Sequence, residues 1–295
     1  MKVAVIGTGF GKHAAAPAYE GLGCQVEVVS PRDEAAVRRA LASDVDLVSV
    51  HSPPFLHVDH VLAAIGAGRP VLCDKPFGRS AQDAVAMRDR ATEAGVPHFL
   101  NFEFRHNASW ARLKQLADSG AVGTPLHLAW SFWGSGLRGR RLGWMNDAAL
   151  GGGWIGAYGS HIIDFTRYLF GSEVADCGAA TRTDIPGATA EDAYSAWFVL
   201  ANGATAVHDT GFAAPVATPP RVALTGSDGV IELIGDTTLV LRRPGHDAVT
   251  EEFSAGAALP TYLGLVLDAI RTGTAITPSF DDGVAVAEVM DRLRS

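Results

Sequence analysis

Short apolar runs separated by amphipathic segments make up the first third of the chain. The apolar runs predict strands at Lys2–Ile6, Val26–Val29, Leu47–Val50, Val71–Cys73 and His98–Leu100. The segments between them predict helices at Lys12–Glu20, from Asp33 onward, at Phe55–Ala67 and at Ser80–Glu93. Asp33 and Ser80 are of the residue types that cap a helix N-terminus. This alternation of strands and helices predicts a doubly wound, parallel sheet with helices on both faces.

The pattern changes after residue 105, where strand-like segments follow one another with few helices between them. Strands are expected at Leu126–Trp133, Val174–Thr181, Ala193–Leu200, Ala204–Phe212, Val222–Thr225, Val230–Leu233 and Thr238–Arg242. Helices are expected at Trp110–Ser119, Trp154–Phe170, Tyr262–Arg271 and Gly283–Arg294. Tight turns such as Ala201-Asn202-Gly203 join neighbouring strands and favour antiparallel pairing. We therefore expect two domains, 1–105 and 106–295, the second of them α+β with a mainly antiparallel sheet.

Composition excludes several classes of protein. The 295 residues carry a formal net charge of −8, which argues against a nucleic-acid surface because phosphate binding needs clustered Lys and Arg. Three cysteines without C-x-x-C spacing predict neither a disulfide framework nor a zinc site, and no metal-ligand spacing is present. No apolar run is long enough to cross a membrane, and a strand is expected from Lys2 onward, so we expect a cytoplasmic protein.

A glycine-rich turn follows the first predicted strand, at Gly7-Thr8-Gly9-Phe10-Gly11. Between a strand and a helix, such a turn brings backbone amides and the helix dipole to a pyrophosphate. The usual third small residue would fall at Lys12. We expect Gly11 to take over its close packing while Lys12 points outward. A glycine turn without a ligand is the alternative, and the strand–turn–helix context favours dinucleotide binding.

The end of the second strand bears on which dinucleotide binds. An acidic residue there would accept the ribose 2′-hydroxyl of NAD, whereas a nearby cation accommodates the 2′-phosphate of NADP. This chain has Ser30 at that position and Arg32 nearby, and Asp33 is better suited to cap the next helix. The residues favour NADP and leave NAD possible.

Two further segments follow strands whose carboxyl ends should lie at the same edge of the sheet. His51-Ser52-Pro53-Pro54 comes after the third strand, with His57 in the first turn of the next helix. These residues fit a cofactor-lining loop and equally a stiff loop with a helix-capping histidine. Asp74-Lys75-Pro76 comes after the fourth strand, where its position favours a role at the ligand over that of a surface lysine.

Several motifs in fixed order resemble the glucose–fructose oxidoreductase/inositol dehydrogenase (Gfo/Idh/MocA) family. The matching stretches are the glycine turn, Asp46-Leu47-Val48-Ser49-Val50 with Ser52-Pro53-Pro54-Phe55-Leu56-His57, Ala67 to Pro76, Gly151-Gly152-Gly153, and Gly159-Ser160-His161-Ile162-Ile163-Asp164. Their order and spacing span nearly the whole chain. The resemblance implies a Rossmann domain followed by an α+β domain whose open sheet often forms an oligomer contact. It therefore implies a homo-oligomer.

The resemblance also implies roles for individual residues. Lys75 occupies the place of a lysine that contacts both nicotinamide and substrate, with Asp74 where glutamate is usual. His161 occupies the place of the catalytic histidine. Two departures are Ala157, where many dehydrogenases of the family have aspartate, and Met145 in a usual Trp-Arg pair. The first departure removes a group that could handle a proton or orient the substrate.

Oxidation of an alcohol carbon needs a hydride acceptor, a base and a group that stabilises alkoxide character. The hypothesis assigns the base to His161, whose unperturbed pKa suits it, and the stabilising cation to Lys75. Asp164, three residues beyond His161, could orient the imidazole, face the core or pair with Arg167. Glu103, Arg105 and His106 could line the pocket or cap the next helix. Trp154 and Tyr158 could stack on a sugar ring or belong to the core.

The first hypothesis for function is an NAD(P)-dependent oxidoreductase acting on a sugar, a polyol or a related hydroxy or keto compound. Two alternatives stay open at this stage. One is a nucleotide-binding sensor that no longer turns over, suggested by Ala157. The other is NAD-dependent glycoside cleavage with transient redox chemistry.

Overall fold

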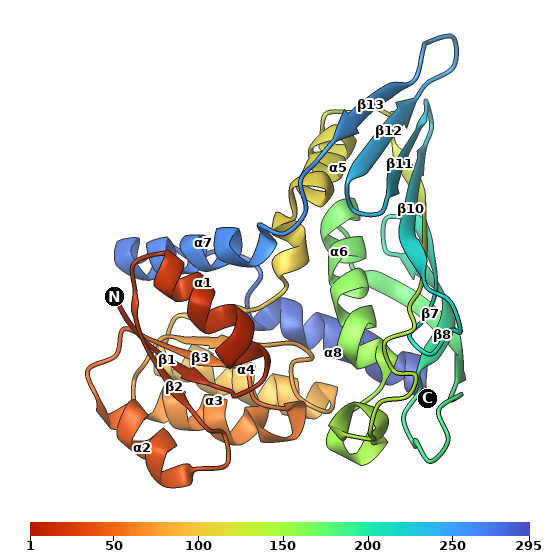
Figure 1. Cartoon of the computed structure of the whole chain (residues 1–295). Coiled ribbons are helices and arrows are strands. Elements are labelled where there is room, and N and C mark those ends of the chain that lie inside the picture. The colour runs from red at the N-terminus through yellow and green to blue at the C-terminus, as the bar shows by residue number, and fades with distance from the viewer. The chain divides into compact units, whose positions relative to one another are not determined.

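A computed structural model describes residues 1–295, and its chain forms two compact units (Figure 1). Unit 1 comprises Met1–Glu103 and Ala258–Glu288, and unit 2 comprises Phe104–Ala257 and Val289–Ser295. By compactness, Ala258–Glu288 therefore group with the first unit although they follow the second in sequence. The functional roles expected of domains 1–105 and 106–295 stay predictions.

Unit 1 is a parallel sheet of five strands in the order β2-β1-β3-β4-β5. The strands are β1 (Lys2–Ile6), β2 (Gln25–Val29), β3 (Leu47–Val50), β4 (Val71–Cys73) and β5 (His98–Leu100). Every neighbouring pair is parallel. All residues of β3 and β4 are buried, as expected where helices cover both faces of a sheet. The predicted parallel sheet is confirmed.

Two helices of unit 1, α2 (Glu34–Ala42) and α4 (Ala81–Ala94), begin where the sequence places capping residues. The others are α1 (Ala16–Gly21), preceded by a π-helical turn (Gly11–Ala15), α3 (His57–Gly66), preceded by a 3-10 turn (Pro54–Leu56), α7 (Ala258–Thr272) and most of α8 (Phe280–Arg294). Asp33 caps α2 by accepting from the Ala36 amide, and Ser80 caps α4 by accepting from the Asp83 amide. Both predicted N-caps are confirmed.

Helices α1 and α7 cover one face of this sheet and α2 and α3 the other (Figure 1). The core beneath α1 and α7 contains Val3, Leu47, Leu72, Phe99, Tyr19, Tyr262, Leu263, Val266 and Leu267. Because these side chains come from both ends of the chain, the sheet core of unit 1 is complete only with α7 in place.

Unit 2 is an open sheet of eight strands in the order β13-β12-β11-β10-β6-β9-β8-β7. The strands are β6 (Pro125–Trp133), β7 (Val174–Arg182), β8 (Ala193–Leu200), β9 (Thr205–Gly211), β10 (Thr218–Gly226), β11 (Val230–Ile234), β12 (Thr238–Arg242) and β13 (Val249–Glu252). Only β6 and β9 pair in parallel. The mainly antiparallel sheet was predicted, whereas β13 was not, because it has only one apolar residue.

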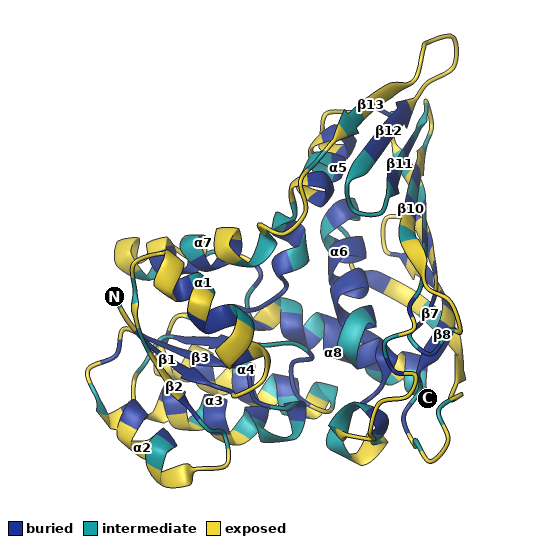
Figure 2. Cartoon of the chain, viewed as in Figure 1, coloured by how far each residue is buried: buried dark blue, intermediate teal, exposed yellow.

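The helices of unit 2 are α5 (Ala108–Asp118) and α6 (Ser160–Phe170), which follows a π-helical turn at Ile155–Gly159. Short 3-10 turns occur at Glu103–His106, Trp144–Asn146 and Ala148–Leu150. Helix α6 is buried over most of its length (Figure 2). In contrast, β8 alternates between buried and exposed residues, and Trp197 on it is 47% exposed. Self-association through this face stays a prediction.

Candidate active site

Polar or glycine residues directly follow all five strands of unit 1. They are Gly7, Ser30, His51, Asp74 and Asn101. Because the strands are parallel, these residues lie at one edge of the sheet, where ligands of doubly wound folds bind. The order of strands reverses between β1 and β3, which places Gly7 and His51 at the switch point.

The glycine turn is closely packed on one side and open on the other. A Cβ on Gly7 would lie 2.6 Å from the His51 carbonyl oxygen, and one on Gly11 would lie 3.0 Å from the His51 Cβ. Around Gly9 a Cβ would meet no atom within 4 Å. Thr8, Phe10 and Lys12 are exposed, and Gly11 packs closely, as expected. This shape fits a pyrophosphate approaching the backbone at a helix N-terminus.

A pocket of about 450 Å³ lies beside the end of β2. It is lined by Pro31, Arg32, Glu34, Val37, Arg38, Phe55, Leu56, Asp59 and His60. Arg38 lies 3.7 Å from Glu34, whereas Arg32 forms no ion pair in the structure. Asp33 is engaged as the N-cap of α2. The pocket thus offers one unpaired guanidinium beside two carboxylates, a mixed environment for a ribose.

Asp74 is the centre of a polar cluster at the edge of the sheet. Its Oδ2 lies 3.1 Å from His51 Nδ1, and its Oδ1 accepts from the Asn101 side-chain amide at 3.1 Å and from the Lys75 backbone N–H at 3.0 Å. Burial alone would raise the pKa of Asp74, but the hydrogen bond from His51 and the charge of Lys75 lower it below its usual range. The carboxylate is therefore ionised and holds three partners.

His57 is fully buried and bridges two loops. Its Nε2 lies 2.7 Å from the Ser52 carbonyl oxygen and its Nδ1 lies 3.1 Å from the Pro76 carbonyl oxygen. Burial lowers the pKa of His57 to about 4, so the ring is neutral near pH 7 and its single N–H can donate to only one of these two carbonyls. Because the ring is inaccessible, we expect His57 to brace the loops rather than touch a cofactor. Ser52 itself contacts His60 through its hydroxyl, at 3.0 Å, and Pro53 and Pro54 complete this loop.

Glu103 lies at the end of unit 1 in a buried position. Burial raises its pKa to about 8, although the charge of Lys75 acts in the opposite direction and that of Asp74 adds to the increase. Glu103 is therefore mostly protonated at neutral pH, next to an ionised carboxylate. Two carboxyl groups with separated pKa values at one strand edge are typical of sites that handle protons.

His161 lies near the start of α6 in unit 2 and is 2% exposed. Its imidazole stacks on the Phe104 ring, with ring centroids 3.8 Å apart and planes 7° from parallel. This stacking restricts rotation of the imidazole about its side-chain bonds. The histidine expected to exchange a proton is thus held in one orientation by an aromatic neighbour.

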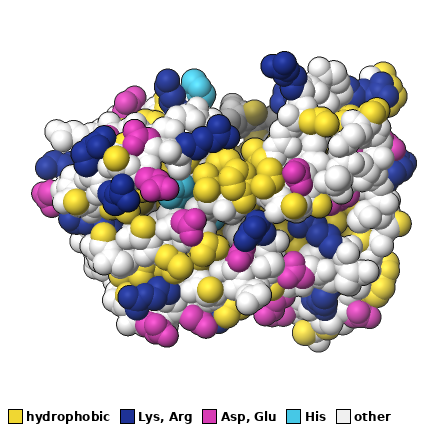
Figure 3. All heavy atoms as spheres, turned by 90° about the horizontal axis from the view of Figure 1, so that it is seen from below, with side chains coloured by type: hydrophobic (Ala, Val, Ile, Leu, Met, Phe, Trp, Pro, Cys, Tyr) yellow, Lys and Arg dark blue, Asp and Glu magenta, His cyan; other side chains and the backbone are white.

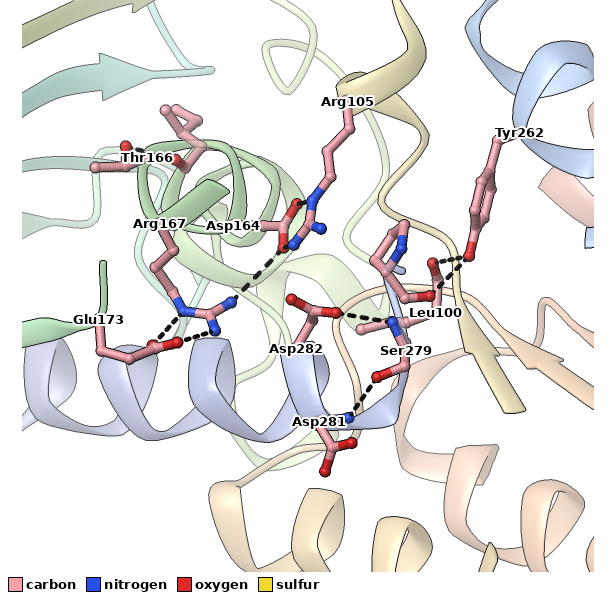
Figure 4. A network of polar contacts seen from close by, with 12 residues as sticks. Leu100, Arg105, Asp164, Thr166, Arg167, Glu173, Tyr262, Ser279, Asp281 and Asp282 are labelled. Atoms are coloured by element: carbon pink, nitrogen blue, oxygen red, sulfur yellow. Dashed lines mark hydrogen bonds and ion pairs between the residues drawn. The ribbon is translucent and has the colours of Figure 1, made fainter. Parts of the chain in front are cut away.

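Asp164 forms a buried ion pair with Arg105 (Figure 4). The Arg105 guanidinium donates to both carboxylate oxygens, from Nε to Oδ2 at 2.7 Å and from Nη2 to Oδ1 at 2.5 Å. Arg167 lies farther away, at 3.8 Å, and donates instead to Glu173. Of the alternatives open from sequence, Asp164 thus takes a charge-paired position in the core, and its main partner is Arg105 rather than Arg167.

Trp154 and Tyr158 belong to an aromatic cluster in unit 2. The Trp154 ring stacks on Tyr158, with centroids 4.9 Å apart, and on Phe212, with centroids 4.3 Å apart. Trp154 is 5% exposed and donates its indole N–H to Thr210. Tyr158 is partly exposed. Trp154 is thus a core residue in the structure, whereas Tyr158 keeps some accessible surface.

The glycines before α6 permit close approaches that other residues would prevent. Gly153 has φ +108°, and a Cβ there would lie 2.2 Å from Glu191 Oε1. Glu191 in turn accepts from the Ile155 amide at the start of the π-helical turn and from Arg294. This packing sets the direction in which α6 and His161 begin.

Sequence reasoning did not identify Asn101, which donates to Asp74, nor Ser49 and Tyr19, which extend this cluster from His51 by side-chain hydrogen bonds. Asn101 follows β5, so its position after a strand was the available signal. Ser49 and Tyr19 lie within a strand and a helix and carry no comparable signal. No three His, Cys, Asp or Glu side chains come together as metal ligands, and the expectation of a metal-free site stays a prediction. None of the helices is both long and apolar enough to span a bilayer.

Two family models match the chain. The model described as "Oxidoreductase family, NAD-binding Rossmann fold" matches residues 1–102, and the one described as "GFO/IDH/MocA C-terminal domain" matches residues 110–232. The chain belongs to the Gfo/Idh/MocA family. The resemblance drawn from the motifs is thereby confirmed, as is the Rossmann fold of the first unit.

Curated relatives of this family member carry oxidoreductase names. An uncharacterised oxidoreductase of Synechocystis is 32% identical over 58% of this chain and 52% of its own length. Levoglucosan dehydrogenase of Pseudarthrobacter phenanthrenivorans is 31% identical over 48% of this chain and 37% of its own length. Both matches cover less than two thirds of the relative. Inositol 2-dehydrogenase of Mycolicibacterium gilvum is 27% identical over 84% of this chain and 71% of its length.

Solved structures show the same fold at low sequence identity. Levoglucosan dehydrogenase in complex with NADH and levoglucosan has a TM-score of 0.90 and 22% identity, covering 100% of this chain and 96% of that one. An oxidoreductase of Agrobacterium radiobacter in complex with NAD+, L-tartaric acid and magnesium has a TM-score of 0.89 and 21% identity, covering 100% and 95%. These structures support the two-part α/β fold.

Proposed function

We propose that the protein is an NAD(P)-dependent oxidoreductase that transfers a hydride between the nicotinamide and a CH–OH carbon of a sugar, a polyol or a related hydroxy or keto compound. The observation that carries the proposal is the placement of Lys75 at the same sheet edge as the glycine turn, in a unit of an NAD-binding family. The names of relatives, which include levoglucosan and inositol dehydrogenases, support the substrate class.

Each proposed role follows from the chemistry of a side chain. A bound nicotinamide accepts or supplies the hydride. The ammonium group of Lys75 stabilises alkoxide character on the substrate oxygen and holds that oxygen in place. His161 accepts the hydroxyl proton during oxidation, with its ring held by Phe104. Asp164 acts indirectly by pairing with Arg105 and so holding α6.

Further residues would complete the binding sites. The glycine turn and the loop His51 to Pro54 bind the dinucleotide, and Glu103 and Tyr158 contact the substrate. Trp154 supports Tyr158 through their stacking. For the cofactor we propose a preference for NADP, supported by the unpaired Arg32 and by the use of Asp33 as an N-cap. NAD remains the alternative, because Glu34 and Asp59 also line the pocket.

The test is replacement of Lys75 by Ala. Turnover on a panel of sugars and polyols should fall by about a thousandfold, because removal of one oxyanion-stabilising donor typically costs a hundredfold to a thousandfold. Calorimetric titration with NADPH and NADH should show affinities within about threefold of the native protein. Lys114→Ala is the matched control, because this lysine lies on α5 of unit 2 and pairs with Asp118 of the same helix, and it should change neither quantity.

Equal losses of turnover and nucleotide affinity would contradict the proposed role of Lys75. Nucleotide binding without turnover on any substrate would instead indicate a sensor. Exchange of a carbon-bound hydrogen with solvent and no net NAD(P)H production would indicate glycoside cleavage with transient redox chemistry. In the titration, tighter binding of NADH than of NADPH would overturn the NADP preference and leave the reaction class intact.

A further inference from the structure

A continuous chain of side-chain hydrogen bonds crosses the sheet of unit 1. Tyr19 Oη lies 3.0 Å from Ser49 Oγ, Ser49 Oγ lies 2.8 Å from His51 Nε2, and His51 Nδ1 lies 3.1 Å from Asp74 Oδ2. Tyr19 and Ser49 have no exposed surface, and His51 is 6% exposed. Buried polar groups of this kind are costly unless each is paired, so the direction of every donor can be worked out.

The direction of donation along these hydrogen bonds is set at Tyr19, the residue farthest from Asp74. Burial raises the pKa of Tyr19 above its ordinary value, so its hydroxyl keeps the proton. Ser49 is the one hydrogen-bond partner of that hydroxyl in the structure, so Tyr19 donates to Ser49. Ser49 must then donate to Nε2 of His51, which leaves the imidazole proton on Nδ1. His51 therefore donates to the ionised carboxylate of Asp74.

Asp74, whose carboxylate is held by His51, in turn orients the backbone of Lys75. Its Oδ1 accepts the Lys75 backbone N–H at 3.0 Å, so the carboxylate orients the peptide group that carries the lysine side chain. Asn101 donates to the same oxygen at 3.1 Å. A carboxylate held from two sides has little freedom to rotate, and the backbone of Lys75 follows its orientation.

His51 is itself fixed by the glycine turn. Gly7 and Gly11 leave no room for a Cβ against His51, and the Phe10 ring lies with its centroid 5.6 Å from that of the imidazole. His51 thus packs against the glycine turn with its backbone and Cβ. Its ring hydrogen-bonds to Asp74 in the lysine turn (Asp74–Pro76). Replacement of the ring leaves the backbone contact with Gly7 in place.

We infer that His51 is a positioning residue that holds the lysine turn in register with the glycine turn, through a neutral imidazole that donates from Nδ1 to Asp74. The inference rests on the proposed function of Lys75 for its effect on turnover, but not for its effect on structure. The alternative is that the imidazole only fills space, in which case any side chain of suitable size at position 51 would serve.

Two replacements of equal shape separate these possibilities. In His51→Asn the side-chain amide can still donate to Asp74, whereas in His51→Leu a side chain of similar shape cannot. Tyr19→Phe is the matched control, because it removes the far hydroxyl and leaves Ser49 able to donate to His51. Thermal unfolding of each variant shows whether it is folded before other measurements are compared.

The measured quantity is the chemical shift of the Lys75 side chain, which reports on its environment. Reductive methylation of the whole protein with ¹³C-formaldehyde makes this signal visible by two-dimensional NMR. The chain has only the lysines Lys2, Lys12, Lys75 and Lys114, and Lys75→Arg identifies the signal. We expect the Lys75 signal to shift in His51→Leu and to stay near its native position in His51→Asn and Tyr19→Phe. Turnover should fall about a hundredfold more in His51→Leu than in His51→Asn, as for a displaced catalytic group. Titration of both variants with NADPH and NADH shows how much of that difference comes from nucleotide binding.

Equal shifts in His51→Leu and His51→Asn, or no shift in either, would overturn the inference. These outcomes do not depend on turnover. If the signal moves as expected but Lys75→Ala retains activity, the positioning role stands and the proposed function fails. If Lys75→Ala abolishes activity but neither His51 variant moves the signal, the proposed function stands and the inference fails.

Discussion

The lysine turn of unit 1 and the histidine-bearing helix α6 of unit 2 are held in place by different kinds of interaction. The carboxylate beside Lys75 has three separate hydrogen-bond partners, one of which leads on to Ser49 and Tyr19. His161 stacks on Phe104, and Asp164 of α6 pairs with two buried guanidinium groups, closely with that of Arg105 and at 3.8 Å with that of Arg167. The hydrogen bonds around Asp74 should tolerate the loss of its charge, whereas two buried guanidinium groups that share the carboxylate of Asp164 should not.

Charged side chains elsewhere are arranged in a less specific way. Figure 3 shows Lys and Arg interspersed with Asp and Glu over one face of the molecule, without a large patch of either sign. Ion pairs on such surfaces contribute little, because water screens them. The buried surroundings of Asp74 and of Asp164 are therefore compared, and matched Asp→Asn replacements test how they differ.

The largest effect is expected for Asp164→Asn. Arg105, whose side chain is 5% exposed, would lose its charged partner, and breaking a buried pair costs about 3–5 kcal/mol. All six tryptophans lie in unit 2, so urea unfolding followed by tryptophan fluorescence reports on this unit. Asp118→Asn, which removes the exposed partner of Lys114 on α5, is the control and should change stability far less. If Asp164→Asn lowers the free energy of unfolding by less than about 1 kcal/mol, unit 2 does not depend on this one buried carboxylate.

A smaller effect is expected for Asp74→Asn in unit 1. The amide oxygen can still accept from Lys75 and Asn101, and His51 can shift its proton to Nε2 and reverse the chain toward Tyr19. The reversal leaves the Tyr19 hydroxyl without an acceptor, so we expect a loss of about 1–2 kcal/mol. Far-UV circular dichroism during urea unfolding measures it. A loss as large as that of Asp164→Asn would remove the distinction between the two units.

The smallest effect is a change in pH dependence for Glu103→Gln. The folded protein holds the Glu103 proton up to a pKa of about 8, whereas the unfolded chain releases it near 4.5. The folded state therefore binds more protons between these values, and Glu103 makes stability fall as pH rises through this range. Urea unfolding at several pH values between 5 and 8 should show a flatter decline for Glu103→Gln. An unchanged slope would mean that Glu103 is ionised in the folded protein.

Much of the first unit was predictable because its strands are short apolar runs between turn residues. β1, β3, β4 and β5 have the predicted bounds. The glycine turn and Lys75 could be placed at one edge because parallel strands bring their carboxyl ends together. Local pattern thus determined both the sheet and the position of the candidate site along it.

The pairings within the site were not predictable, because they join residues far apart in sequence. His51 meets Asp74 across 23 positions, and Arg105 meets Asp164 across 59. Spacing at i+3 drew attention to His161 and Arg167 as partners of Asp164, but a helical spacing says nothing of a guanidinium arriving from another segment. Likewise, the amphipathic pattern of α7 predicted a helix without indicating which sheet its apolar face covers.

The position of α7 has a consequence for how the protein is made. Tyr262 and Leu263 fill the core over β1 and β3, and the Tyr262 hydroxyl lies 2.7 Å from the Leu100 carbonyl oxygen. During synthesis the five strands leave the ribosome early, but the helix that covers one of their faces leaves after all of β6 to β13. The nascent nucleotide-binding sheet therefore keeps an uncovered apolar face while the whole second sheet is translated, and it closes only when α7 emerges.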